Sequence, residues 1–420
     1  MENQTISKPE PGALFRWMIL LFVSLAMFGN YYIYDSISPL ADLLSKQLKF
    51  TDSDIGLLQG IYSVPNVFMV LIGGIIIDKI GTRISTFIFT VLCLIGVTIT
   101  ATSSTLAWMA TGRLIFGLGA ESMIVAVTTV IGRWFKGKQL SFAFGLNLTL
   151  ARLGSFAALN SPTWAKSLYE YWQHPLMISV GAGVIAVASV IIYWGMDSYA
   201  ERSFSLRPVP KQDKIILKEI FSFSTSYWFV VLLCVTFYSG IFPFQTFAVK
   251  FFMESHGTTR EMGGFLSSML TLSAMLLTPL FGLMADYVGK RSLLMMFGSL
   301  LLVPVYLLMA YTKVSLYVPM AMMGVAFSLI PAVMWPSVAI IVDEAKLGTA
   351  YGLMTMIQNI GLAGFNFLIG WANDFSGGYT MGMWIFSSLG FIGLLFAFLL
   401  RRSEMGPHGH GLEKGIAKTE

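Results

Sequence analysis

Two oppositely charged residues lie deep inside apolar stretches of the sequence. Glu121 lies in the run before a short basic turn at residues 133–138, and Arg152 lies in the run after it. At about 1.5 Å per helical residue, Glu121 is roughly 18 Å and Arg152 roughly 21 Å from that turn. A charge at the centre of a bilayer costs roughly 2.5–3.5 kcal/mol and needs a partner or a wet cavity. The pair therefore predicts either a site for a ligand that carries both charges or a structural ion pair.

The composition indicates which class of protein carries these two charges. Hydrophobic residues make up 55% of the 420 residues and charged residues only 12%, whereas a soluble globular chain carries about 25% charged residues. Apolar runs long enough to cross a bilayer recur throughout the sequence. We expect an all-α membrane protein with twelve transmembrane helices, at residues 15–36, 55–77, 84–104, 106–131, 139–164, 176–196, 225–249, 262–285, 292–311, 315–341, 350–373 and 380–400.

The basic residues predict the orientation of these spans. With both termini in the cytoplasm, nineteen of the 27 lysine and arginine residues fall in cytoplasmic tails and loops, six on the opposite face and two inside spans. Because basic residues are enriched in cytoplasmic loops, the count favours cytoplasmic termini. The net charge of +5 then lies beside anionic headgroups of the lipid bilayer. We expect no nucleic-acid partner.

The chain divides into two halves that repeat each other. Blocks beginning at Gly73, Ala143 and Gly117 recur at Phe281, Ala350 and Gly324, with offsets of 208, 207 and 207. Parallel six-span repeats with a ligand site between them are typical of major facilitator transporters. The expected organisation is an N-terminal cytoplasmic tail at 1–14, a six-helix bundle at 15–196, a central cytoplasmic loop at 197–221, a second six-helix bundle at 222–400 and a C-terminal cytoplasmic tail at 401–420.

One recurring block contains a loop sequence, G-x-x-x-D-x-x-G-x-R, that resembles a motif of the major facilitator superfamily. The charged residues that fill the two copies are Asp78, Lys79, Arg83, Asp286, Lys290 and Arg291. An aspartate here can bind basic groups and helix N-termini on a neighbouring span, so we interpret these residues as a conformational latch. Arg113, in the sequence R-x-x-x-G-x-G, is assigned to the same latch. Its alternatives are snorkelling to the membrane interface and pairing with Asp35.

Further short motifs extend over most of the spans. They include Tyr34-Asp35, Tyr62-Ser63, Pro65-Asn66, Glu121-Ser122, residues 134–138, Ala151-Arg152, Phe242-Pro243-Phe244, Trp335-Pro336 and residues 357–359. In these motifs the sequence resembles the family of lysosomal dipeptide uniporters within the major facilitator superfamily, and its microbial relatives. The resemblance implies that an acid in the fourth span and an arginine in the fifth hold the two ends of a dipeptide. Glu121 and Arg152 occupy those positions.

The chemistry of a dipeptide agrees with this assignment. Arginine offers a planar fork to a carboxylate, and Glu121 can accept hydrogen bonds from an ammonium group. Aromatic side chains can form the walls of an adaptable pocket, although helix packing is an equal alternative for each of them. The other predicted substrate-binding residues are Tyr34, Tyr62, Phe242 and Trp335 as walls, Asn66, Gln245 and Asn359 as partners of the peptide link, and Asp35.

We expect a transporter rather than an enzyme. The sequence contains no phosphate loop, nucleophile elbow or metal-ligand cluster, so no catalytic residue, metal or cofactor is predicted. Glu121 is taken as the only acid near mid-depth, with Asp35 nearer the outer face, which favours a dipeptide uniporter. A proton- or ion-coupled symporter of another small carboxylate-bearing solute and a non-transporting receptor are the alternatives. We further expect a monomer that needs no accessory subunit, in a prokaryotic cell (inner) membrane.

Overall fold

The protein is built from helices. The computed structural model describes residues 9–135, 139–205, 223–343, 346–407 and 409–414, and this part of the chain contains no β-strand. The first half comprises α1 (Ala13–Asp35), the 3₁₀ turn η1 (Ser38–Leu40), α2 (Ala41–Leu48), α3 (Asp52–Gly60), α4 (Ser63–Thr102), α5 (Leu106–Phe135), α6 (Leu140–Leu159), α7 (Ser161–Trp164), η2 (Lys166–Leu168) and α8 (Gln173–Ser203). The second comprises α9 (Thr225–His256), α10 (Arg260–Val288), α11 (Arg291–Tyr311), α12 (Tyr317–Ile341), α13 (Leu347–Ser376) and α14 (Thr380–Glu404).

The predicted twelve crossings are confirmed, with one break hidden inside a continuous helical stretch. Eleven stretches among the described residues are long and apolar enough to span a membrane, and one of them, Asp52–Thr102, has 51 residues. A straight helix of that length would measure about 76 Å, far more than the ~30 Å hydrocarbon core. Gly81, with φ 81° and ψ 163°, interrupts the helix inside α4. Glycine reaches this backbone region without a Cβ clash, so the stretch forms two spans.

One predicted boundary lies too early in the chain. The loop expected from residue 197 onward begins later, because α8 continues to Ser203. Asp197 and Glu201, on successive turns of α8, both form salt bridges with Arg133 at the end of α5. These contacts stabilise another helical turn where polarity alone had indicated a loop. The remaining residues of the predicted loop, from 206 to 221, lie outside the described residues, as do residues 136–138 of the basic turn.

The outer surface is the kind of surface that a bilayer covers. Large apolar side chains on many spans are exposed, for example Phe68 on α4, Leu283 on α10 and Phe391 on α14. Exposed apolar patches of this extent are rare on soluble monomers. Inside, each half has its own main cluster of buried side chains, and the cluster of the second half also includes Ala41 and Ile55 of the first.

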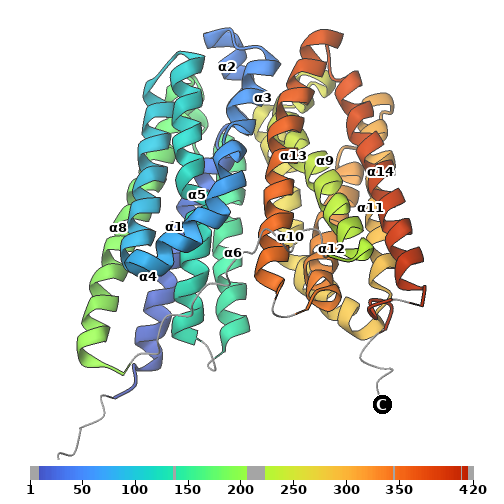
Figure 1. Cartoon of the computed structure of the whole chain (residues 1–420). Coiled ribbons are helices and arrows are strands. Elements are labelled where there is room, and N and C mark those ends of the chain that lie inside the picture. The colour runs from blue at the N-terminus through green and yellow to red at the C-terminus, as the bar shows by residue number, and fades with distance from the viewer. Residues whose placement is uncertain (1–8, 136–138, 206–222, 344–345, 408, 415–420) are drawn as a thin grey trace, which may run out of the picture.

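The two halves meet at one end of the molecule, which we call the α3 end. In Figure 1, α2 and α3 lie at the top beside α13, whereas α1 begins and α14 ends at the bottom, the terminal end. Backbones approach closely where the halves touch. A Cβ on Gly370 of α13 would lie 2.2 Å from the Asp52 carbonyl oxygen, and one on Gly264 of α10 would lie 2.3 Å from the Leu159 carbonyl oxygen. Only glycine permits these distances.

Charged side chains reinforce this contact. In the described part of the chain, the salt bridges that cross between the halves at the α3 end are Lys250–Asp52, Arg260–Asp42 at 2.6 Å and Lys166–Glu261 at 2.6 Å. In addition, the Asp374 carboxylate of α13 accepts hydrogen bonds from the backbone N–H groups of Asp52 and Ser53, at 2.9 and 2.8 Å, where α3 begins. Negative charge is favourable at a helix N-terminus. The structure is therefore the state of the protein that is closed at the α3 end.

Candidate functional site

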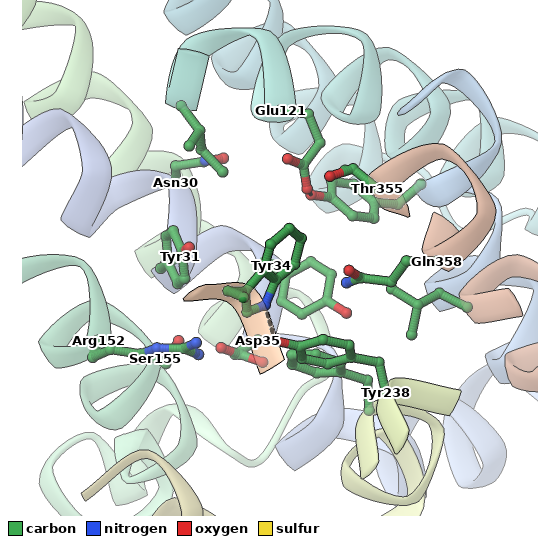
Figure 2. Close-up of a pocket in the computed structure, with 15 residues that line it drawn as sticks. Asn30, Tyr31, Tyr34, Asp35, Glu121, Arg152, Ser155, Tyr238, Thr355 and Gln358 are labelled. Carbon is green, nitrogen blue, oxygen red and sulfur yellow. Dashed lines mark hydrogen bonds between the residues drawn. The ribbon is translucent and has the colours of Figure 1, made fainter. Parts of the chain in front are cut away.

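A cavity of about 270 Å³ lies between the two halves (Figure 2). Seven of the ten predicted substrate-binding residues line it, namely Tyr34, Asp35, Tyr62, Glu121, Arg152, Phe242 and Trp335. The first half supplies every charged side chain of the lining. The second half supplies uncharged ones, namely Tyr238, Phe242, Trp335, Thr355, Gln358 and Leu362. The site is thus chemically asymmetric although the fold is a repeat.

Glu121 is positioned by the close packing of α5 against α4. A Cβ on Gly117 would lie 2.2 Å from the Tyr62 carbonyl oxygen, so a larger residue would push the two helices apart. This approach brings the Tyr62 hydroxyl to Glu121, where it donates a hydrogen bond of 3.2 Å to Oε1. A carboxylate has about four acceptor sites. Glu121 therefore keeps capacity for the hydrogen bonds of an ammonium group.

Arg152 lies on another wall of the cavity. Gly154 lets α6 pack closely on α1, because a Cβ there would lie 2.2 Å from the Phe28 carbonyl oxygen. The Arg152 guanidinium carbon lies 5.6 Å from the ring centroid of Tyr31 and 5.4 Å from that of Phe327, which is within cation–π range. Among the described residues, Arg152 forms no salt bridge. Its planar donor fork is held by aromatic rings and remains available to a carboxylate.

Glu121 and Arg152 do not form the structural ion pair that was the alternative expectation. Figure 2 shows Glu121 above, and Arg152 below, the side chains of Tyr31 and Tyr34. No salt bridge joins the two charges in the described part of the chain. Both side chains are partly exposed to the cavity rather than fully buried. This separation fits a ligand that carries one charge at each end.

Asp35 is the last residue of α1 and lines the same cavity as Glu121. A ligand in the cavity can therefore meet two acids, and the expected difference in their depths stays a prediction. The suggested salt bridge with Arg113 does not form among the described residues. The Arg113 side chain is buried at the α3 end of its span and donates to the Gln59 Oε1 at 2.7 Å and to the carbonyl oxygens of Leu58, Ile33 and Tyr34, at 3.2, 3.3 and 3.4 Å. Arg113 thereby ties α5 to α1 and α3.

Three predicted residues do not line the cavity: Asn66, Gln245 and Asn359. All three are buried. The Asn359 amide donates to the Thr355 carbonyl at 3.0 Å, one turn back along α13, and the Gln245 carbonyl accepts from the Ser38 hydroxyl at 2.5 Å. Gln358 lies in the cavity instead. Successive helical residues differ by about 100° around the axis, so an error of one position points a side chain away from the site.

Several lining residues were not predicted as part of the site. They are Asn30, Tyr31, Ile124, Ser155, Tyr238, Thr355, Gln358 and Leu362. A simple signal was present in the sequence. Tyr31, Ile124 and Ser155 each lie three residues from a predicted site residue, and Tyr238 lies four residues before Phe242. Residues at these spacings share a helix face.

The predicted latch residues lie mostly at the terminal end, away from the cavity. Arg83 forms salt bridges with Asp197 at 3.4 Å and Glu201 at 2.6 Å, both within the first half. In the second half, Arg291 pairs with Asp286 at 2.5 Å. Asp78, Lys79 and Lys290 are exposed. The latch role of these residues stays a prediction, and Arg113 lies at the opposite end of its span from them.

Comparison with known proteins identifies the family. The model of the Major Facilitator Superfamily matches the chain twice, over residues 23–249 and 229–418. The chain belongs to the Major Facilitator Superfamily. It is a multi-pass membrane transporter and not an enzyme, as predicted.

Relatives within the superfamily are similar over most of their length. The lysosomal dipeptide transporter MFSD1 of Danio rerio is 32% identical over 363 residues, covering 83% of this chain and 79% of that protein. The protein of the same name from Homo sapiens is 30% identical over 407 residues, covering 93% and 87%. A crystal structure of the nucleoside transporter NupG shares the fold, with a TM-score of 0.73, 17% identity and coverage of 92% of this chain and 99% of that one.

Proposed function

We propose that this chain carries dipeptides across the membrane by alternating access. The observation that carries the proposal is the placement of Glu121 and Arg152 on different walls of one cavity, without a salt bridge between them. The ammonium group of a dipeptide binds Glu121 and its carboxylate binds the Arg152 fork. The names of the MFSD1 relatives, which are lysosomal dipeptide transporters, support the same substrate class.

The closed α3 end gives the direction of access in this state. The excess of basic residues at the terminal end supports a cytoplasmic location for that end. The cavity then communicates with the cytoplasm, and the salt bridges at the α3 end close it to the other side. Rocking of the two halves about the cavity opens the α3 end, as expected for a transporter built from repeats. We propose that the protein lies in a cell membrane. We also propose that it is a monomer and needs no accessory subunit.

Uniport remains the favoured mechanism, but Asp35 supports a second candidate. A dipeptide has one ammonium and one carboxylate, which Glu121 and Arg152 match. Asp35 is a further acid in the lining of the same cavity, and an acid that is not engaged by substrate can carry a proton. A proton-coupled symporter is therefore the alternative function. A receptor that does not transport differs from both, because it binds the dipeptide without uptake into proteoliposomes.

A ligand series tests the two charged contacts separately. Arg152→Lys keeps the charge but loses the planar fork, and Glu121→Gln removes the negative charge. We expect each change to weaken binding of a free dipeptide. A C-terminally amidated dipeptide already lacks the Arg152 contact, so Arg152→Lys should hardly weaken it further. An N-acetylated dipeptide should be similarly insensitive to Glu121→Gln.

This experiment is a double-mutant cycle with the ligand as one partner. Arg402→Lys and Glu170→Gln are matched controls, because both residues are exposed and neither lines the cavity. The controls should leave all affinities unchanged. Equal losses for free, amidated and acetylated dipeptides in both site variants would show that the two charges do not hold the ends of the ligand.

A further inference from the structure

A second cavity adjoins the central one. It has a volume of about 310 Å³ and shares three residues with the central cavity, namely Arg152, Tyr238 and Trp335. The remaining lining residues are Gly145, Leu148 and Thr149 of α6, Ala274, Met275, Thr278 and Pro279 of α10, and Phe327 and Pro331 of α12. Nothing in the two-charge scheme uses this space. We call it the side cavity.

The lining of the side cavity defines the chemistry of its occupant. Arg152 is the only charged residue among the described residues that line it, and aliphatic, aromatic and thioether side chains form most of the wall. Thr149 donates its hydroxyl to the Gly145 carbonyl at 3.0 Å, and the Trp335 indole donates to the Tyr238 hydroxyl at 3.0 Å. The Thr149 hydroxyl and the Trp335 indole are therefore used within the protein. The cavity suits an apolar group and disfavours a cationic one.

The position of Arg152 determines which part of a dipeptide reaches the side cavity. Arg152 lines both cavities, whereas Glu121 lines only the central one. A dipeptide held by both charges has its carboxylate at the boundary between them. The side chain next to that carboxylate belongs to the C-terminal residue. The side chain of the N-terminal residue starts close to Glu121, in the central cavity.

The volume of the central cavity leads to the same conclusion. At about 270 Å³, it lies at the lower limit of roughly 300–1,000 Å³ for small-molecule sites. A dipeptide with a large side chain therefore needs additional space. On α6 the side cavity extends from Arg152 back to Gly145, toward the terminal end and away from the closed α3 end. The extra space therefore lies on the terminal-end side of Arg152, where the closed α3 end does not limit its size.

We propose that the side cavity is the subsite for the C-terminal side chain of the dipeptide and that it selects large apolar or aromatic residues there. This inference rests on the proposed dipeptide function. Met275 of α10, Phe327 and Trp335 form the contacts of the subsite. Phe327 has a second role, because its ring also holds the Arg152 guanidinium.

Two dipeptides with the same composition test the proposal. Ala-Phe and Phe-Ala have identical formal charge and differ only in which end carries the ring. We expect purified wild-type protein to bind Ala-Phe about tenfold more tightly than Phe-Ala, a difference of about 1.4 kcal/mol. Met275→Trp fills the subsite, so it should lower the affinity for Ala-Phe to that for Phe-Ala while the affinity for Ala-Ala stays within about twofold.

Leu276→Trp is the matched control. Leu276 is the neighbouring residue on α10, is exposed on the outer surface and does not line the side cavity, so this variant should bind all three dipeptides as wild type does. If Met275→Trp does not fold, Met275→Ala enlarges the subsite and should favour Ala-Trp over Ala-Phe relative to wild type. Equal affinities of wild type for Ala-Phe and Phe-Ala would overturn the subsite.

The outcomes separate the subsite from the function on which it rests. If Ala-Ala binds and its binding depends on Glu121 and Arg152, the dipeptide site stands whatever the two isomers do. Equal isomer affinities then refute the subsite alone. Failure of all three dipeptides to bind wild type refutes both the function and the subsite.

Discussion

The buried salt bridge between Lys250 and Asp52 predicts how strongly the closed state is stabilised. The Lys250 side chain is 10% exposed and the Asp52 side chain 7% exposed, and the two residues belong to different halves. Opening of the α3 end must separate them and hydrate both. We expect Lys250→Met to strand the Asp52 carboxylate in the closed state and to leave it hydrated in the open state. The variant should therefore shift the equilibrium toward the state open at the α3 end.

The size of this shift in the equilibrium follows from the burial of the salt bridge. Removing one partner of a buried salt bridge costs about 3–5 kcal/mol. The lower end of that range applies here, because Asp52 keeps a hydrogen bond of 2.9 Å from the Asn373 amide. If the closed state is destabilised by about 3 kcal/mol relative to the open state, the open-to-closed equilibrium constant changes by about 100-fold. The double variant Asp52→Asn, Lys250→Met leaves no buried charge without a partner. Its open-to-closed equilibrium should therefore shift less than that of Lys250→Met alone.

Distances between spin labels at Ser104 and Lys313 provide the assay. Both residues are exposed, and they lie in the connections that follow α4 and α11 toward the α3 end, one in each half. Opening should lengthen the distance between the labels. Lys166→Met is the control, because Lys166–Glu261 also crosses between the halves but its side chains are 77% and 26% exposed. Such a pair contributes at most about 1 kcal/mol, a shift below about fivefold. A Lys250→Met distance distribution identical to that of the control would refute the reasoning.

Three further predictions address the close backbone contact, the latch and ion coupling. Gly370→Leu should also populate the open α3 end, because its Cβ would lie 2.2 Å from the Asp52 carbonyl oxygen; unchanged label distances would contradict this. Asp78→Asn should weaken closure of the terminal end, so labels placed across that end should report more of the state seen here, and an unchanged distribution would remove the latch role. In proteoliposomes, a proton gradient alone should not drive dipeptide accumulation. Concentrative uptake that Asp35→Asn abolishes would instead establish proton coupling.

Charge and repetition made much of the architecture predictable. An acid and an arginine inside apolar runs are costly unless they face a cavity, so Glu121 and Arg152 stood out without any structure. The break at Gly81 also followed from length, because no single span accommodates the apolar sequence on both sides of it. These features depend on residue type and chain length, which the sequence states directly.

The uncharged part of the site was less predictable because it depends on helix rotation. Asn359 was predicted as a site residue, whereas the neighbouring Gln358 lines the cavity. Both are amides, and only their angle around α13 separates them. The length of α8 beyond residue 196 depended on the partners of Asp197, which come from a distant helix.

The asymmetry of the cavity lining has a consequence for the energy barrier of transport. In the proposed function, both charged contacts to the dipeptide come from the first half, whereas the second half presents only uncharged groups, namely rings, hydroxyl groups, an amide and the aliphatic side chain of Leu362. During rocking, a bound dipeptide can therefore travel as cargo of the first half, with its two ionic contacts intact from one state to the other. The second half slides past it by exchanging dispersion and aromatic contacts, which are individually weak. No step of the movement then has to separate the dipeptide from either of its charged partners.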